Sequence, residues 1–153
     1  MDVQPVALNS LKSAFRLFRQ DLEALPEEAF TQEMGGKART VADIVYEVNL
    51  VNDDITANMR GEGCAEWPEG WIKAPEGCRT KQEVIAAFDA SSQAVLAQVE
   101  AYSEHDIIAK VTTEHGETDR FERCRFMAMH TWYHSGQLNY IQTLRGDDGW
   151  HWS

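Results

Sequence analysis

Four stretches of the chain repeat apolar residues at spacings of three and four, which is the period of an amphipathic α-helix. The stretches are Val6 to Leu25, a second that opens at Thr40, a third that opens at Thr80, and Asp119 to Leu144. In the last stretch one continuous buried face is expected, formed by Phe126, Met127, His130, Tyr133, His134, Gln137, Ile141 and Leu144. Four helices of about 20 residues each, with no strong strand signal, predict an all-α four-helix bundle.

Threonines mark the starts of two of these helices. Thr80 is followed three residues later by Glu83, which is the pattern of a capping box, and Thr40 with Asp43 resembles one. A long loop rich in Gly, Pro and Trp is expected at 61–79, between the second and third helices. Loops of this length are often functional, although its tryptophans could simply cover the end of the bundle. A short extended piece is expected at 107–111, with no obvious partner strand, and the chain 1–153 is predicted to be a single domain.

The acidic charge balance limits the partners of the protein. The chain has 25 acidic and 14 basic residues, a net charge of −11, whereas nucleic-acid backbones and anionic membranes need a basic surface. No stretch approaches the roughly 20 apolar residues of a membrane span, and the first residues lack the features of a signal peptide. The three cysteines form no CxxC pair, although Cys64 and Cys78 could pair in principle. We therefore expect a cytoplasmic protein with neither a nucleic acid nor a membrane as partner.

His130 and His134 stand four residues apart in the last predicted helix. This spacing places both imidazoles on one helix face, about 6 Å apart at Cβ, and lets a helix offer two nitrogen ligands to one metal ion. Each buried ring needs hydrogen-bond partners, and a shared ion would meet that need. Two hydrogen-bonded core histidines fit the spacing equally well, so the spacing alone leaves both interpretations open.

The residues after the pair favour the metal. Gly136 and Gln137 follow His134 after one intervening residue, and the stretch resembles the last-helix motif HxxxHRGQ of the DinB/YfiT-like family of four-helix-bundle metalloenzymes. Ser135 departs from the usual arginine, a change expected to alter a neighbouring contact and not the ligands. Gly136 is expected to let a neighbouring group approach closely. Gln137 lies about one turn from His134, where it can hydrogen-bond a ligand or a metal-bound water.

The resemblance also implies a third ligand on the second helix, about seven residues after the residue that caps it. Counting from Thr40 reaches Glu47, a carboxylate where the family typically has a histidine. Two histidines and one carboxylate bind zinc in hydrolytic enzymes and iron in oxygenases. An ordinary solvated glutamate is the alternative interpretation. The other candidates for the third ligand are Asn49, Asp53 and His151.

By resemblance, Glu47, His130 and His134 would hold a divalent ion, with zinc or nickel favoured and iron or manganese as alternatives. The implied activity is that of a metal-dependent thiol S-transferase or a related hydrolase. The implied partners are a small-molecule substrate, which enters beside the 61–79 loop, and a low-molecular-weight thiol. Tyr133 or Gln137 would orient the nucleophile. The resemblance further implies a homodimer.

A function of a different class is also open. The protein could be a stress-associated binding module that holds a structural metal or a small ligand without catalysis. A fourth protein ligand such as His151 would close the coordination shell and favour this function, whereas an open position favours catalysis. A metal-free bundle with two core histidines is the third interpretation.

Overall fold

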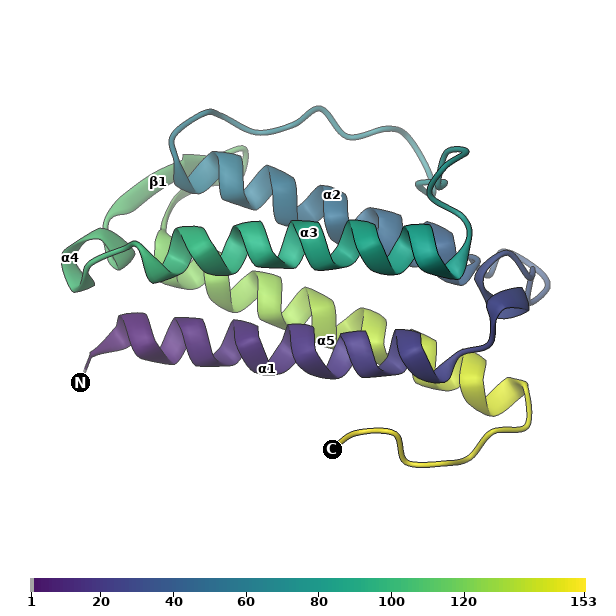
Figure 1. Cartoon of the computed structure of the whole chain (residues 1–153). Helices are drawn as coiled ribbons and strands as arrows, with labels where there is room; N and C mark the ends of the chain where they lie inside the picture. Colours follow the sequence, from purple (N-terminus) through teal and green to yellow (C-terminus); the bar gives the residue numbers. More distant parts are fainter. Residues whose placement is uncertain (1) are drawn as a thin grey trace.

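The computed structural model describes residues 2–153, and four long helices lie side by side in it (Figure 1). These helices are α1 (Val3–Ala24), α2 (Val41–Met59), α3 (Lys81–Glu100) and α5 (Arg120–Leu144). Helices α1 and α2 each pack against both α3 and α5. Each long helix therefore has two neighbours, and the predicted all-α four-helix bundle is confirmed. Two short helices, η1 (Glu27–Phe30) and α4 (Glu104–Ile107), lie in the connections.

The helix caps explain where α2 and α3 begin. The Thr80 hydroxyl accepts the Glu83 amide and the Glu83 carboxylate accepts the Thr80 amide, so the predicted capping box is present. At α2 the Thr40 hydroxyl accepts the Asp43 amide at 3.2 Å, but the Asp43 carboxylate accepts the amide of Ala74 at 2.8 Å instead. The second box is therefore only half formed, because Asp43 ties the long loop to the first turn of α2.

The core lies between the four helices. The ring of Phe88 in α3 is 1% exposed and contacts the rings of Phe15 and Phe18 in α1, with centroid distances of 5.9 and 4.9 Å. Cys124 is buried against Met59, and burial raises the pKa of its thiol to about 12, so it is no nucleophile. All three cysteines are free thiols. Within residues 2–153, no helix combines the length and the apolar character that a membrane span requires.

The predicted buried face of α5 was only partly right. Met127, His134 and Ile141 are buried, but Phe126, Tyr133 and Leu144 are 42%, 62% and 52% exposed. The eight predicted residues span an arc of about 120° at 100° per residue, and the bundle covers only one side of that arc. The buried stripe is centred instead on Ala128, Thr131, Ser135 and Leu138. His130 therefore lies at the boundary between the core and the solvent.

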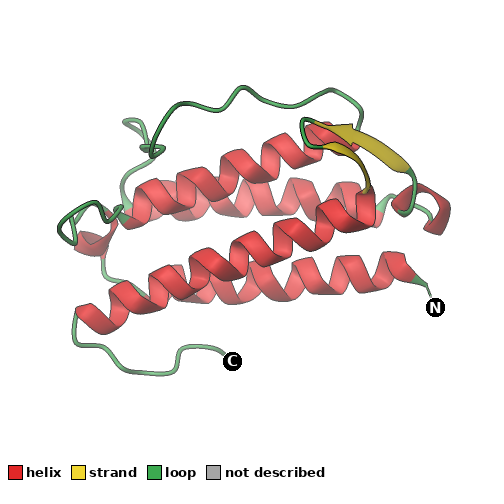
Figure 2. Cartoon of the chain, turned by 180° about the vertical axis from the view of Figure 1, so that it is seen from behind, coloured by secondary structure: helices red, strands yellow, loops and turns green. Residues whose placement is uncertain are grey.

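The segment before α5 forms a β-hairpin, so the extended piece has the partner strand that was not expected (Figure 2). Strand β1 (Lys110–Thr113) pairs in antiparallel register with β2 (Gly116–Asp119). The second strand, Gly-Glu-Thr-Asp, has no apolar alternation, and this is why the sequence pattern did not reveal it. The Asn58 side-chain amide donates to the Thr112 carbonyl at 2.7 Å and fastens the hairpin to the end of α2.

The predicted long loop runs back along α2 from the end of that helix to the start of α3 (Figure 1). The amide of Ala65 donates to the Asp54 carboxylate near its beginning, and Ala74 is held by Asp43 near its end. Trp71, which is 61% exposed, lies over the guanidinium of Arg39, with 4.6 Å from Cζ to the ring centroid. Trp71 therefore does more than cover the end of the bundle, because it contacts Arg39.

The last residues, 146–153, fold back beside α1 and α5 (Figure 1). The Trp152 indole N–H donates to the carboxylate of Asp21 at 2.7 Å, and the Asn139 amide donates to the same oxygen at 3.0 Å. The hydroxyl of Ser135 donates to the other oxygen of Asp21. Asp21 is 1% exposed, and burial raises the pKa of its carboxyl. Ser135 thus belongs to a buried polar cluster on the far side of His134.

Candidate metal centre

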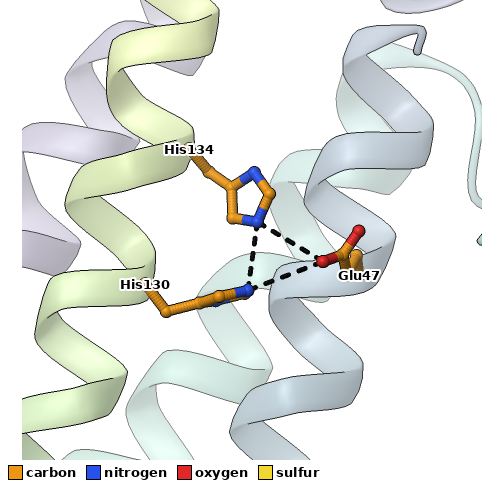
Figure 3. A group of neighbouring side chains, drawn as sticks. All are labelled: Glu47, His130 and His134. Carbon is orange, nitrogen blue, oxygen red and sulfur yellow. Dashed lines mark hydrogen bonds and ion pairs between the residues drawn. The ribbon is translucent and has the colours of Figure 1, made fainter. Parts of the chain in front are cut away.

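Glu47 of α2 faces His130 and His134 of α5 across one side of the bundle (Figure 3). The two Nε2 atoms lie 3.0 Å apart, and each lies 3.6 Å from Oε1 of Glu47. In the described part of the chain, these are the side chains that meet the geometry of a three-ligand metal group. The other candidates, Asn49, Asp53 and His151, are not part of this group.

The spacing of the three atoms fits a first-row divalent ion. A point equidistant from the two Nε2 atoms and Oε1 lies about 2 Å from each, which is the usual length of Zn–N and Zn–O bonds. Helix geometry produces the arrangement, because positions four apart on α5 bring both imidazoles to the face that meets α2. The three residues can therefore hold an ion without large movement.

The hydrogen bond between His134 and Gln137 favours the same chemistry. Nδ1 of His134 lies 2.8 Å from Oε1 of Gln137, a carbonyl oxygen that can only accept, so Nδ1 carries the proton and Nε2 carries the lone pair. This is the tautomer that a metal ligand needs. Nδ1 of His130 is buried and has no hydrogen-bond partner among the described residues. Gln137 thus contacts the candidate ligand His134 directly, through the ring.

Arg39 completes the surroundings of Glu47, and sequence reasoning missed it. Its side chain is 7% exposed and forms an ion pair with Oε2, the oxygen of Glu47 that faces away from the histidines. Its Nη2 also donates to Oε1 of Gln137 at 3.4 Å. The available signal was the need of a half-buried Glu47 for a cation, together with the arginine directly before the Thr40 cap.

Tyr133 and Gly136 both lie on the exposed side of α5. The Tyr133 ring is 62% exposed. It contacts the ring of His134 in a T-shaped arrangement, with a centroid distance of 4.9 Å and an interplanar angle of 75°. A side chain at Gly136 would meet no atom within 4 Å, so the expected close approach at this glycine is wrong. The glycine opens space at the surface of α5, next to Tyr133.

Burial keeps both histidines neutral. Desolvation, with smaller contributions from nearby positive charge, lowers the pKa of His130 and of His134 to about 4. A neutral imidazole presents a lone pair, so protons compete with a metal ion only when the pH approaches these values.

The affinity of the protein for Zn²⁺ is therefore expected to change little between pH 7 and pH 5, and to fall below pH 5. Histidines with an ordinary pKa of about 6.5 would instead lose affinity progressively from pH 6.5 downward, by up to tenfold per pH unit for each ring. Competition titrations with a chelator of known pH dependence would measure the difference. A steep loss that begins at pH 6.5 would contradict the low pKa of the rings.

Two cavities lie beside the centre. The hairpin cavity, about 390 Å³, is lined by Glu47 and His130 together with residues of the long loop, the β-hairpin and the first turns of α5. The Gln137 cavity, about 600 Å³, lies between the start of α2 and the second half of α5, and Arg39, Tyr133 and Gln137 line it. The centre is therefore accessible from a space large enough for a small molecule.

Comparison with known proteins identifies the family. The DinB superfamily matches residues 10–138. The chain belongs to this superfamily. A search of curated proteins finds no match. The resemblance predicted from the HxxxHxGQ pattern is thus confirmed.

Several solved structures share the fold. A DinB-like protein from Bacillus cereus superimposes with a TM-score of 0.74 at 12% identity, over 92% of this chain and 91% of that one. A conserved protein from Enterococcus faecalis gives 0.72 at 15% identity, over 96% and 99%. A mycothiol-dependent maleylpyruvate isomerase gives 0.70 at 13% identity, and the match covers 88% of this chain and 60% of the isomerase. At these identities the likeness shows the fold alone.

Proposed function

We propose that this DinB superfamily member binds a divalent metal ion through Glu47, His130 and His134 and catalyses a metal-dependent reaction of a small molecule. The observation that carries the proposal is the convergence of two Nε2 atoms and one carboxylate oxygen at separations of 3.0 and 3.6 Å. The N₂O donor set suits zinc or nickel, with iron and manganese as alternatives.

The number of ligands supports catalysis over a purely structural ion. His151, the candidate for a fourth protein ligand, pairs with Asp147 in the last residues at 2.9 Å and is not near the centre. Three protein ligands leave at least one coordination position for a substrate or a water. Glu47 and His130 line the hairpin cavity, from which such a molecule would reach the centre. These features favour an enzyme over a non-catalytic binding module.

The chemistry that a bound ion would supply is the acidification of a coordinated thiol or water, so that a nucleophile exists at neutral pH. The residues of this chain have separate tasks. Gln137 fixes the tautomer of His134, and the ion pair with Arg39 holds Glu47 in place. Burial keeps both imidazoles neutral, and binding of an ion would replace the hydrogen bond between their Nε2 atoms. We propose a thiol S-transferase or a related hydrolase, with a low-molecular-weight thiol as partner.

The test combines metal analysis with turnover. Protein purified without an affinity tag is expected to contain about one equivalent of metal, and the metal-loaded protein to accelerate the reaction of a small thiol with an electrophile such as 1-chloro-2,4-dinitrobenzene. Chelation should abolish the acceleration and Zn²⁺ should restore it. Full metal content without turnover of thiols or esters would favour the binding module, and the absence of metal affinity would refute the proposal.

The homodimer stays a prediction. A row of exposed apolar and aromatic residues on α5 offers the surface for it: Phe126, Met129, Tyr133, Tyr140 and Leu144. Their spacing of three, four or seven residues, with Gly136 between Tyr133 and Tyr140, places them on one helix face.

A further inference from the structure

Arg123 is the arginine that has no hydrogen-bond or ion-pair partner among the described residues. The chain has nine arginines, and within residues 2–153 eight of them form a hydrogen bond or ion pair, with carboxylates, side-chain amides or backbone carbonyls. Arg123 forms none, and its Nε is buried without a partner. In a chain with a net charge of −11, a half-buried guanidinium without a carboxylate partner is a feature that needs an explanation.

The surroundings of Arg123 place it in the hairpin cavity. Arg123, Glu47 and His130 all line this cavity. Arg123 Cζ lies 5.5 Å from the centroid of the Phe126 ring, and that ring stacks on His130 with a centroid distance of 6.0 Å and an interplanar angle of 20°. Stacking on Phe126 therefore fixes the guanidinium in the same space as the candidate metal centre.

The acidic side chains that line the same cavity form no ion pair or hydrogen bond with Arg123 in the described part of the chain. The carboxylate of Asp54 accepts the amide of Ala65, and that of Glu114 lies 3.3 Å from Nε2 of His115. Glu47 is paired with Arg39. The N–H groups of Arg123 are therefore free to bind a ligand, and a guanidinium matches the planar, two-oxygen geometry of a carboxylate.

We propose that Arg123 binds a carboxylate group of the substrate in the hairpin cavity while the reacting end of that substrate lies at the metal centre. The second half of this statement rests on the proposed function, and the first half does not. Arg123 and His130 are seven residues apart on α5, so about 10 Å of helix separates their Cα atoms. The substrate class is thus a small organic acid whose carboxylate and reactive group lie at opposite ends of a short spacer.

The test uses 6-mercaptohexanoate and 6-mercaptohexanol, which share a thiol for the metal and differ in the carboxylate. Calorimetry on the Zn²⁺-loaded protein is expected to show about tenfold tighter binding of the acid, as one charge-assisted contact provides. Arg123→Gln should reduce the preference to within twofold. Arg125→Gln is the matched control, because Arg125 lies two residues away and is paired with Glu122. Equal binding of both compounds to the wild type, or a preference that survives Arg123→Gln, would overturn the proposal.

A second arm works without metal. Hexanoate, which has no thiol, is expected to shift the Nε–H resonance of Arg123 in ¹⁵N spectra of the metal-free protein, whereas hexanol is not. If the protein takes up no metal, the proposed function fails while this arm still decides the role of Arg123. If hexanoate leaves the resonance unchanged, the carboxylate site is refuted whatever the metal content.

Discussion

Replacing His134 by alanine is expected to lower the affinity of the protein for Zn²⁺ by about 10²–10³-fold. Zinc sites with four ligands bind with about 10–16 kcal/mol, so the loss of one ligand costs on the order of 3–4 kcal/mol. His134 is 1% exposed and its Nε2 lies 3.0 Å from that of His130, so water cannot take its place without rearrangement. The measurement is a competition titration with a chromophoric chelator, at pH 7 for both proteins.

Two further variants make this result interpretable. His105→Ala removes an exposed histidine of α4 and should leave the affinity unchanged. Glu47→Gln keeps the size of the third candidate ligand and removes its charge. Because the size is kept, a loss of metal affinity in this variant would reflect the lost ligand and not a loss of folding. Unchanged metal affinity in both His134→Ala and Glu47→Gln, with folding intact by circular dichroism, would eliminate the centre and with it the proposed function.

The second large effect is expected at Arg39. Arg39→Met should lower the free energy of unfolding of the metal-free protein by about 2–4 kcal/mol, because the half-buried carboxylate of Glu47 loses its partner. An ion bound to Glu47 would offset much of that charge, so the loss should be smaller in the metal-loaded protein. Urea denaturation with a chelator and with Zn²⁺ measures both values.

The matched control for Arg39 is Arg60→Met. Arg60 also pairs with a glutamate, Glu62, at 2.7 Å, but both side chains are about half exposed, and exposed pairs contribute little to stability because water screens them. Equal losses in the two variants would mean that burial does not strengthen the Arg39–Glu47 pair. The same loss with and without Zn²⁺ would mean that the ion does not interact with Glu47.

The helices could be predicted because each carries its own local signals. The apolar period and the threonine caps place the starts of α2 and α3 at the residues observed. The hairpin could not be predicted, since Gly116–Asp119 is stabilised by its pairing with β1 and by the end of α2, and neither contact leaves a pattern in the strand itself. The exposed side of α5 was mispredicted for a related reason, because the angular width of a buried face depends on the neighbouring helices.

The candidate site also contains residues that the sequence could predict and residues that it could not. His130 and His134 follow from a four-residue spacing, and Glu47 from a count that starts at the Thr40 cap, so a motif and a helix start were sufficient. Arg39 lies outside any helix, and its role depends on a contact between the loop before α2 and the side of α5. Arg123 is recognised only by the hydrogen bonds that it lacks, which a sequence does not record.

The buried carboxylate of Asp21 has a consequence for how relatives of this chain vary. It takes its donors from Ser135, Asn139 and Trp152, three side chains from two separate segments. An arginine at position 135, as in the HxxxHRGQ motif, would supply a cation and several donors to the same carboxylate. Substitutions at positions 21, 135 and 152 should therefore covary across the family. Chains with an arginine at position 135 would have no need of an indole at the position of Trp152. Chains with a serine at position 135 would retain the indole.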